Sequence, residues 1–300
     1  MTVRDSKEWA LVLGLFFLPK TSPLQAQVAI DNTTRTGYDP SAFGQGTTAE
    51  GTISTAFGAG SVANGVIDTA FGCGTLSNGR ASTAFGLNTI SGGWASTASG
   101  YGTTANGFAA TVFGKYGQAL GDVSTAFGDT TMASGYASTA FGIWTTASGD
   151  LSTAFGYAST ASGWDSTAWN TGLASGSRST AFGVSALASG TSSTAFGWNA
   201  QATAYCSTAS GYRTIASGSC STASGYFTNA NALDSFAIGA CSVGGGDPVN
   251  WVSTDPIFEI GNGVPGANSD ALVVYKNGSA TFQGPVSVAP GGDIPMFSGN

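Results

Sequence analysis

The sequence predicts an all-β protein, a parallel β-roll or solenoid built from 14-residue coils. The unit Ser-Thr-Ala-Phe-Gly recurs along residues 41–246, as at residues 54–58. Its alanine, replaced once by Val112, returns in constant steps, from Ala56 to Ala70 and onward, apart from one shorter step between Ala168 and Ala181. A weaker copy, Ala-Ser-Gly or Ala-Asn-Gly, lies halfway through each step, as at residues 63–65. A fixed short period of this kind is typical of solenoids, in which each coil is buried only by its neighbours.

Two short strands and two tight turns fit one coil. The 14-residue period is too short for a pair of helices, and Thr, Phe and Gly have poor helix propensity. Alternation along a strand places Ser54 and Ala56 on one face and Thr55 with Phe57 on the other. Alanine recurs in both half-coils, whereas phenylalanine recurs in one half and has Ser or Asn as its counterpart in the other. We therefore expect the alanines inside and the phenylalanines outside; the alternative is a monomeric roll with the phenylalanines inside.

An outward phenylalanine column predicts self-association. Each ring buries about 150–250 Å² when it is covered, so the stacked rings far exceed the apolar patch of roughly 300–600 Å² that a monomer exposes. Covering each ring contributes about 1.5–3 kcal/mol before ordering costs. We expect a closed symmetric oligomer with an interface made of Phe57, Phe71, Phe85, Phe113, Phe127, Phe141, Phe155, Phe182 and Phe196.

Composition and charge narrow the function classes. Charged residues make up 8% of the 300 residues, the net charge is −7, and the nine Lys and Arg residues form no cluster, which argues against nucleic acid as a partner. The chain has no histidine, the commonest general base and transition-metal ligand. Carboxylates such as Asp68, Asp122 and Asp150 are scattered along the coils. We expect no enzyme activity, no catalytic residue, no metal site and no cofactor.

The ends of the chain differ from the repeat. Arg4 and Lys7 precede an apolar run that is too short to span a bilayer, which is typical of a signal peptide, so we expect export and no membrane span in the mature chain. Near the other end, Asn277-Gly278 predicts a tight hairpin. The predicted segments are a signal peptide (1–26), a lead-in and cap (27–40), the roll (41–246), a small β module (247–284) and a Pro/Gly-rich tail (285–300).

Aromatic residues recur at one turn edge, three positions after the column alanine. Exposed aromatics suit stacking on sugars or on a protein partner, and the alternative is that they only pack the turns. The residues predicted to contact a ligand at this edge are Tyr101, Tyr157, Trp198, Tyr212 and Tyr226.

Cys206 and Cys220 share a column in adjacent coils, which places them within reach of each other if the strands are in register. An exported chain permits a disulfide between them, and the alternative is two free cysteines.

The repeat resembles the haemagglutinin-type repeat in the heads of trimeric autotransporter adhesins, the YadA-like heads, in which the usual motif is Ser-Val-Ala-Ile-Gly. The resemblance implies a left-handed parallel β-roll, packed as a homotrimer and displayed at a cell surface. Thr replaces Val here and Phe replaces Ile, so the central packing differs in detail. Residues 255–263 and 275–278 resemble a module that follows such repeats in tail-fibre-like surface proteins.

The expected function is that of a non-enzymatic, secreted or cell-surface adhesin-like fibre head. The chain would associate with itself through the Phe and Thr stripe and present variable turn residues to surface glycans or extracellular matrix proteins. Two alternatives stay open. One is an ice-binding solenoid that uses the Thr column beginning at Thr55, and the other is a tail-fibre-like structural protein.

Overall fold

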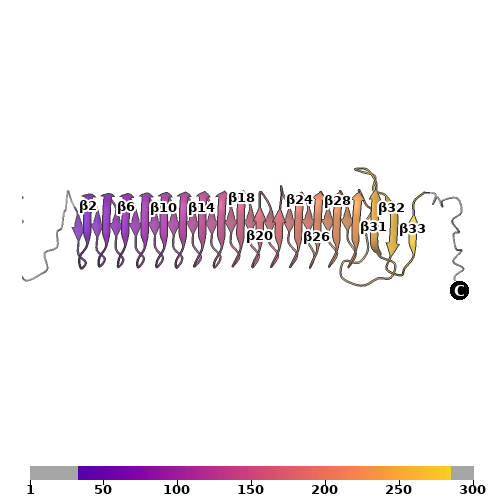
Figure 1. Cartoon of the computed structure of the whole chain (residues 1–300), viewed down its shortest axis with the longest axis horizontal. Helices are drawn as coiled ribbons and strands as arrows, with labels where there is room; N and C mark the ends of the chain where they lie inside the picture. The colour runs from indigo at the N-terminus through magenta and orange to yellow at the C-terminus, as the bar shows by residue number, and fades with distance from the viewer. Residues whose placement is uncertain (1–32, 285–300) are drawn as a thin grey trace, which may run out of the picture.

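Each coil combines a strand of up to five residues with a strand of two residues, joined by two turns, and the coils stack into a rod (Figure 1). The computed structural model describes residues 33–284, and all regular structure within that range is β-strand. The predicted signal peptide, residues 27–32 of the predicted lead-in and the predicted tail lie outside the described residues. The prediction of an all-β solenoid with 14-residue coils is confirmed, since Thr55 pairs with Thr69 and Thr69 with Thr83.

The two-residue strands form the first sheet, a parallel ladder that follows the chain order from one coil to the next. Its strands are β1 (Thr34–Arg35), β3 (Thr48–Ala49), β5 (Val62–Ala63), β7 (Leu76–Ser77), β9 (Ile90–Ser91), β11 (Thr104–Ala105), β13 (Gln118–Ala119), β15 (Met132–Ala133), β17 (Thr146–Ala147), β19 (Thr160–Ala161), β21 (Leu173–Ala174), β23 (Leu187–Ala188), β25 (Gln201–Ala202), β27 (Ile215–Ala216) and β29 (Asn229–Ala230).

The longer strands form the second sheet, in which equivalent residues of successive coils lie opposite each other, as Phe57 lies opposite Phe71. The parallel strands are β2 (Ser41–Gln45), β4 (Thr55–Ala59), β6 (Thr69–Cys73), β8 (Thr83–Leu87), β10 (Thr97–Tyr101), β12 (Thr111–Lys115), β14 (Thr125–Asp129), β16 (Thr139–Ile143), β18 (Thr153–Tyr157), β20 (Thr167–Trp169), β22 (Thr180–Phe182), β24 (Thr194–Trp198), β26 (Thr208–Tyr212), β28 (Thr222–Tyr226), β30 (Phe236–Ala240) and β31 (Pro256–Asn262). The antiparallel strands β32 (Asp270–Tyr275) and β33 (Ala280–Phe282) complete it.

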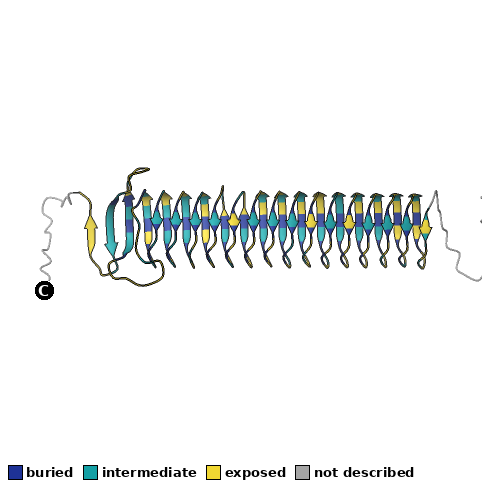
Figure 2. Ribbon diagram, turned by 180° about the vertical axis from the view of Figure 1, so that it is seen from behind, coloured by how far each residue is buried: buried dark blue, intermediate teal, exposed yellow. Residues whose placement is uncertain are grey.

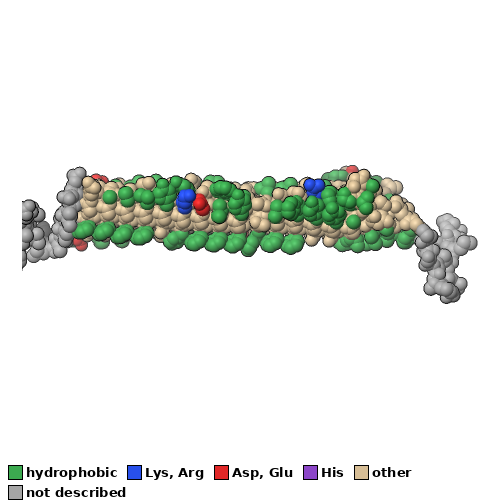
Figure 3. Space-filling view, turned by 90° about the horizontal axis from the view of Figure 1, so that it is seen from above, with side chains coloured by type: hydrophobic (Ala, Val, Ile, Leu, Met, Phe, Trp, Pro, Cys, Tyr) green, Lys and Arg blue, Asp and Glu red, His purple; other side chains and the backbone are tan. Residues whose placement is uncertain are grey.

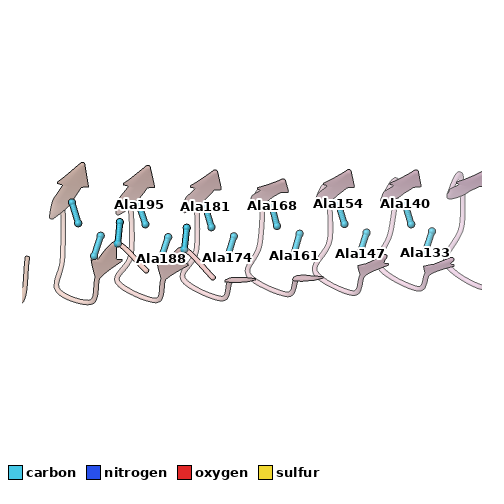
Figure 4. Packing of buried hydrophobic residues seen from close by; sticks show 14 of the residues in the cluster. Ala133, Ala140, Ala147, Ala154, Ala161, Ala168, Ala174, Ala181, Ala188 and Ala195 are labelled. Atoms are coloured by element: carbon cyan, nitrogen blue, oxygen red, sulfur yellow. The ribbon is translucent and has the colours of Figure 1, made fainter. Parts of the chain in front are cut away.

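Alanines of the two sheets meet across a thin interior, as predicted (Figure 4). Ala140 of the second sheet and Ala147 of the first are both fully buried, and the same holds for their equivalents along the rod. Along most of the long strands a buried residue forms a dark band, with half-buried and exposed residues before and after it (Figure 2). Because alanine is the only apolar side chain in most coils of the interior, the two sheets can approach closely.

Serine and threonine lie at the two ends of the interior, beside the alanines. Ser138 and its equivalents are buried where the chain enters the second sheet, and Thr145 and its equivalents are buried where it enters the first. The serine hydroxyl can close its own turn, since Ser138 Oγ donates to the carbonyl oxygen of Gly135 at 2.7 Å. The recurring serine of the motif is therefore a turn residue inside the rod.

Glycine is required at the end of the motif by close contact between coils. Gly58 has a φ of 120°, a conformation that residues with a side chain rarely adopt. A Cβ atom at this position would lie 1.8 Å from the carbonyl oxygen of Gly72 in the next coil. The recurrence of glycine at this position of successive coils thus follows from the stacking distance.

The shortened coil keeps the core in register. Its strand β20 has only three residues, and the missing residue is absorbed in a turn where Asn170 and Thr171 both have positive φ values of 49° and 61°. Ala168 still lies opposite Ala154 and Ala181. The irregularity therefore changes the turn and leaves the alanine columns continuous.

The C-terminal strands extend the second sheet beyond the last coil. Strand β31 pairs in parallel with β30, which places Phe258 opposite Phe236 and Glu259 opposite Ala237. Strands β32 and β33 form the predicted hairpin, in which Gly278 has a φ of 84°. The second sheet thus runs from the roll into residues 247–284 without a break.

Candidate binding surfaces

The phenylalanines predicted as an oligomer interface form one row on the outer face of the second sheet. Their side chains are 37–53% exposed, which agrees with the outward orientation inferred from the sequence. In the middle of the row, the rings of Phe127, Phe141 and Phe155 stack at centroid distances of 4.9 and 4.8 Å, with 4° between planes. The rings cover each other along the row and leave their edges open to solvent.

Substitutions interrupt this phenylalanine stripe in two places. Ser99 separates Phe85 from Phe113, and Ser210 with Ser224 ends the stripe after Phe196. Trp169 instead continues it, since its ring lies 4.6 Å from Phe155 and 5.8 Å from Phe182. The sheet therefore exposes two long apolar segments, a shorter one that ends at Phe85 and a longer one from Phe113 to Phe196.

The Thr column lies beside the phenylalanine stripe on the same face. Its members, such as Thr69, Thr139 and Thr208, are half-buried, and the neighbouring column is made of exposed aromatic rings rather than of a second row of hydroxyls. This face is therefore apolar and polar in alternate columns.

The five aromatic residues predicted at the turn edge are all exposed, but the structure brings only three of them together. Trp198, Tyr212 and Tyr226 form a ladder with centroid distances of 6.1 and 5.2 Å. Tyr101 and Tyr157 stand apart from this ladder. Figure 3 shows hydrophobic side chains gathered in separate rows and groups along the rod, with few charged side chains among them.

The sequence analysis did not predict a second set of aromatic residues, which lie one position after the predicted aromatic column, four residues after the column alanine. Tyr116 packs edge-on against Tyr101 at 5.1 Å, and Trp144 contacts Tyr157 at 5.3 Å. Phe227 lies 4.8 Å from Tyr226. All three have positive φ values, which turn their side chains toward the edge. Aligning the coils one column further would have found them.

Arginine joins the aromatic ladder near its C-terminal end. The guanidinium carbon of Arg213 lies 5.8 Å from the ring centroid of Tyr212 and 5.3 Å from that of Phe227. At these distances the cation is attracted by the π-systems of both rings. The three residues form a compact group of one cation and two rings, in which Arg213 and Tyr212 are exposed and Phe227 is half-buried.

Cys206 and Cys220 are free thiols in the structure, in adjacent coils and close enough to interact. Desolvation, followed by the neighbouring Cys206 thiol, raises the pKa of Cys220. A raised pKa lowers the thiolate fraction and slows oxidation. No bond joins the two sulfur atoms in the structure, and the disulfide stays a prediction.

The scattered carboxylates have structural contacts along the coils. Asp68 is fully buried and accepts hydrogen bonds from the amides of Gly65 and Ser82, both at 2.8 Å, and from the Ser82 hydroxyl at 3.0 Å. Burial, only partly offset by these bonds, raises the pKa of Asp68. Asp122 and Asp150 each accept a hydrogen bond from a backbone amide of the preceding coil. These contacts hold turns and neighbouring coils together.

Two more buried carboxyl groups lie where the last coil meets β31. Glu259 accepts a hydrogen bond from the amide of Gly244 at 3.1 Å, and Asp270 accepts one from the amide of Val243 at 3.0 Å. Desolvation, with the nearby Asp270 carboxylate as the second cause, raises the pKa of Glu259 to about 7. Burial also raises the pKa of Asp270. This pair tethers the chain segment that leaves the roll.

Within residues 33–284, no helix is long and apolar enough to cross a membrane.

The repeat of this chain matches a known protein family. A family described as the YadA head domain repeat, a unit of two copies, matches residues 36–61, 119–143, 147–168, 174–200 and 216–240. A search of curated protein sequences found no match. YadA-like heads with a β-solenoid fold are typically non-enzymatic and have an adhesin-like role in trimeric autotransporters. The matched repeats and the stacked parallel coils agree, and residues 36–240 of this chain form a YadA-like head.

Proposed function

We propose that the chain is the head of a secreted or cell-surface adhesin that assembles as a homotrimer through the phenylalanine stripe and attaches to surfaces through its turn edges. The observation that carries the proposal is the continuous row of half-exposed rings on one sheet, because no other part of residues 33–284 exposes aromatic side chains in such a regular array.

The size of the stripe supports association. The segment from Phe113 to Phe196 carries an aromatic ring in every coil, Trp169 included, and each of these rings is 36–53% exposed. An apolar surface of this length exceeds the roughly 300–600 Å² that monomeric proteins expose. Threefold packing on a common axis, which the family implies, would cover the stripe of every chain at once.

The turn edges supply the second half of the proposal. Trp198, Tyr212 and Tyr226 are the last residues of strands β24, β26 and β28, where the second sheet meets the turn. Each lies two residues beyond the position of the phenylalanine stripe, which Ser210 and Ser224 occupy in two of these coils, so we expect the ladder to stay accessible when the stripe is covered. The exposed rings, with centroids 6.1 and 5.2 Å apart, suit stacking on sugars or on apolar side chains of matrix proteins. We expect attachment to surface glycans or extracellular matrix proteins through this edge.

The test measures mass and adhesion together. Light scattering of the purified protein is expected to give three times the mass of one chain, and the protein is expected to adhere to immobilised matrix proteins or glycans. Trp198→Ala should weaken adhesion severalfold while the trimer persists. A stable monomer in dilute solution, or full adhesion by Trp198→Ala and Tyr212→Ala, would contradict the proposal.

A further inference from the structure

A hollow of about 490 Å³ lies beside the aromatic ladder, between the last coils and the C-terminal strands. It is lined at the turn by Asn199, Arg213 and Phe227, on the outer face of the first sheet by Gln201 and Asn229, and by Asn268 from the loop before β32. Its volume falls in the range of about 300–1,000 Å³ that small-molecule sites occupy. The turns, the first sheet and the C-terminal module thus all contribute to one concave surface.

The positive charge of Arg213 in this hollow has no acidic partner among the described residues. Between residues 33 and 284 the ion pairs are Lys115 with Asp129 and Lys276 with Asp255, so Arg213 has no carboxylate partner there. Its guanidinium is instead held by the rings of Tyr212 and Phe227. Contact with the two rings restricts the position of the guanidinium and leaves its N–H groups available for a carboxylate or a sulfate. The hollow therefore presents an anion-binding group.

The amides in the hollow have hydrogen-bonding capacity to spare. Across the described residues, the side chains of Asn199, Gln201 and Asn268 form no hydrogen bond, while Asn229 donates one weak bond to the carbonyl oxygen of Ser242 at 3.4 Å. Each primary amide offers two donors and one acceptor oxygen. Paired donors and acceptors of this kind match the vicinal hydroxyl groups of a sugar.

We propose that this hollow binds an anionic glycan, with Arg213 pairing with a sugar carboxylate or sulfate, the amides bonding its hydroxyl groups, and the adjoining ladder of Trp198, Tyr212 and Tyr226 stacking on further sugar rings. The proposal rests on the adhesive function proposed above and names its ligand class. The outer face of the first sheet lies opposite the phenylalanine stripe, so trimer formation through the stripe leaves the hollow open.

The test uses the full-length oligomer and three saccharide probes. Binding of a hyaluronan oligosaccharide, which carries carboxylates, and of a chondroitin sulfate oligosaccharide, which also carries sulfates, is compared with that of neutral N-acetylchitopentaose by calorimetry. We expect both anionic probes to bind at least tenfold more tightly than the neutral one at low salt. We also expect the difference to shrink as the salt concentration rises. Preference for one anionic probe identifies the anion.

Variants locate the site. Arg213→Gln should remove the anionic preference, and Arg213→Lys should restore only part of it because the planar fork is lost. Arg178→Gln is the matched control, since Arg178 stacks on Trp164 at 5.8 Å at the opposite turn edge, and it should bind as the unmodified protein does. Asn199→Ala should weaken both anionic and neutral probes. Thermal unfolding of each variant verifies that the fold is intact.

Several outcomes would overturn this proposal while leaving the adhesive function in place. They are an absence of anionic saccharide binding, unchanged binding by Arg213→Gln, equal affinity for chitopentaose, or equal affinity for poly-L-glutamate, which would indicate an acidic peptide site. In each case the trimer and its adhesion to matrix proteins would persist. A monomeric, non-adhesive protein would instead contradict the function on which the proposal rests.

Discussion

Within the coils of the roll, one buried position in the alanine column of the second sheet carries a larger residue. Val112 lies opposite Ala98 and Ala126 and is fully buried. The coil compensates at Gly117, which stands where the neighbouring coils have Thr103 and Thr131. A Cβ atom at Gly117 would lie 2.7 Å from Cγ2 of Val112 and 3.2 Å from Oγ1 of Thr131. The larger and the smaller residue therefore share one space.

Gly117→Thr should destabilise the roll even though it restores the residue that most coils carry. Overpacking in a filled core costs about 1–3 kcal/mol, and chemical denaturation monitored by circular dichroism would measure it. Combining Gly117→Thr with Val112→Ala should recover most of this loss, because the pair then matches the neighbouring coils. Purely additive effects of the two substitutions would contradict the shared space, since residues in contact show coupling of about 0.5–3 kcal/mol.

At the scale of the elements, strict columns made the coil predictable. Alanine in both halves and phenylalanine in one half decided which face is buried, and the structure agrees at Ala56 and Phe57. The columns next to the turns carried less signal because their residues vary from coil to coil. The aromatic and charged residues at those positions, such as Arg213 and Phe227, meet only through backbone turns with positive φ, which residue alternation does not reveal.

The pairing of the last coil with the C-terminal module was also not predictable from the repeat pattern. Strand β31 continues the ladder after a connection that departs from the 14-residue period, so the repeat gave no indication that Glu259 follows Ala237 in the sheet. An acidic residue at an alanine position is also the opposite of what the column predicts. The hairpin of β32 and β33 was predictable because its turn chemistry is local.

This junction should be sensitive to pH. The pKa of Glu259 is raised to about 7 from the ordinary value of 4.5, so the folded state binds its proton more tightly than the unfolded state does. The stabilisation of the folded state that comes from protonated Glu259 is fully present below pH 4.5 and is lost as the pH rises through about 7. The loss amounts to roughly 3 kcal/mol at most, at about 1.4 kcal/mol for each pKa unit.

Hydrogen exchange of the β31 amides at several pH values would measure this loss, because exchange reports local opening. Glu259→Gln should remove the pH dependence of the stability of β31 between pH 4.5 and 7. At pH 8, the β31 amides of this variant should be better protected from exchange than those of the unmodified chain. Glu50→Gln, at an exposed carboxylate, is the matched control and should change nothing. A steep dependence that persists in Glu259→Gln would assign the effect to another group, with Asp270 the first to examine.

At the scale of the whole molecule, the rod and its stripe belong together. A single chain buries only small side chains between two thin sheets, and its largest apolar side chains lie outside. Stacking about 4.8 Å per coil makes the roll long and narrow (Figure 1). Such a shape has much surface for its volume, so association along its length is the way in which the chain can bury the rings of the stripe.

Changing Phe127, Phe141 and Phe155 together to Ser should therefore dissociate the trimer. The three rings form the best-stacked part of the longer segment, and each still exposes 37–46% of its surface to a partner. Losing their contacts costs about 1–2 kcal/mol for each ring in every chain. The coils should keep their β structure, because the alanines beneath are untouched. Sedimentation velocity would measure the mass and circular dichroism the fold.

The matched control changes Trp198, Tyr212 and Tyr226 together to Ser. This variant removes as many exposed rings from the turn edge and should leave the trimer whole. If the control dissociates the oligomer while the phenylalanine variant keeps it, the chains associate through the turn edge and the stripe serves another purpose.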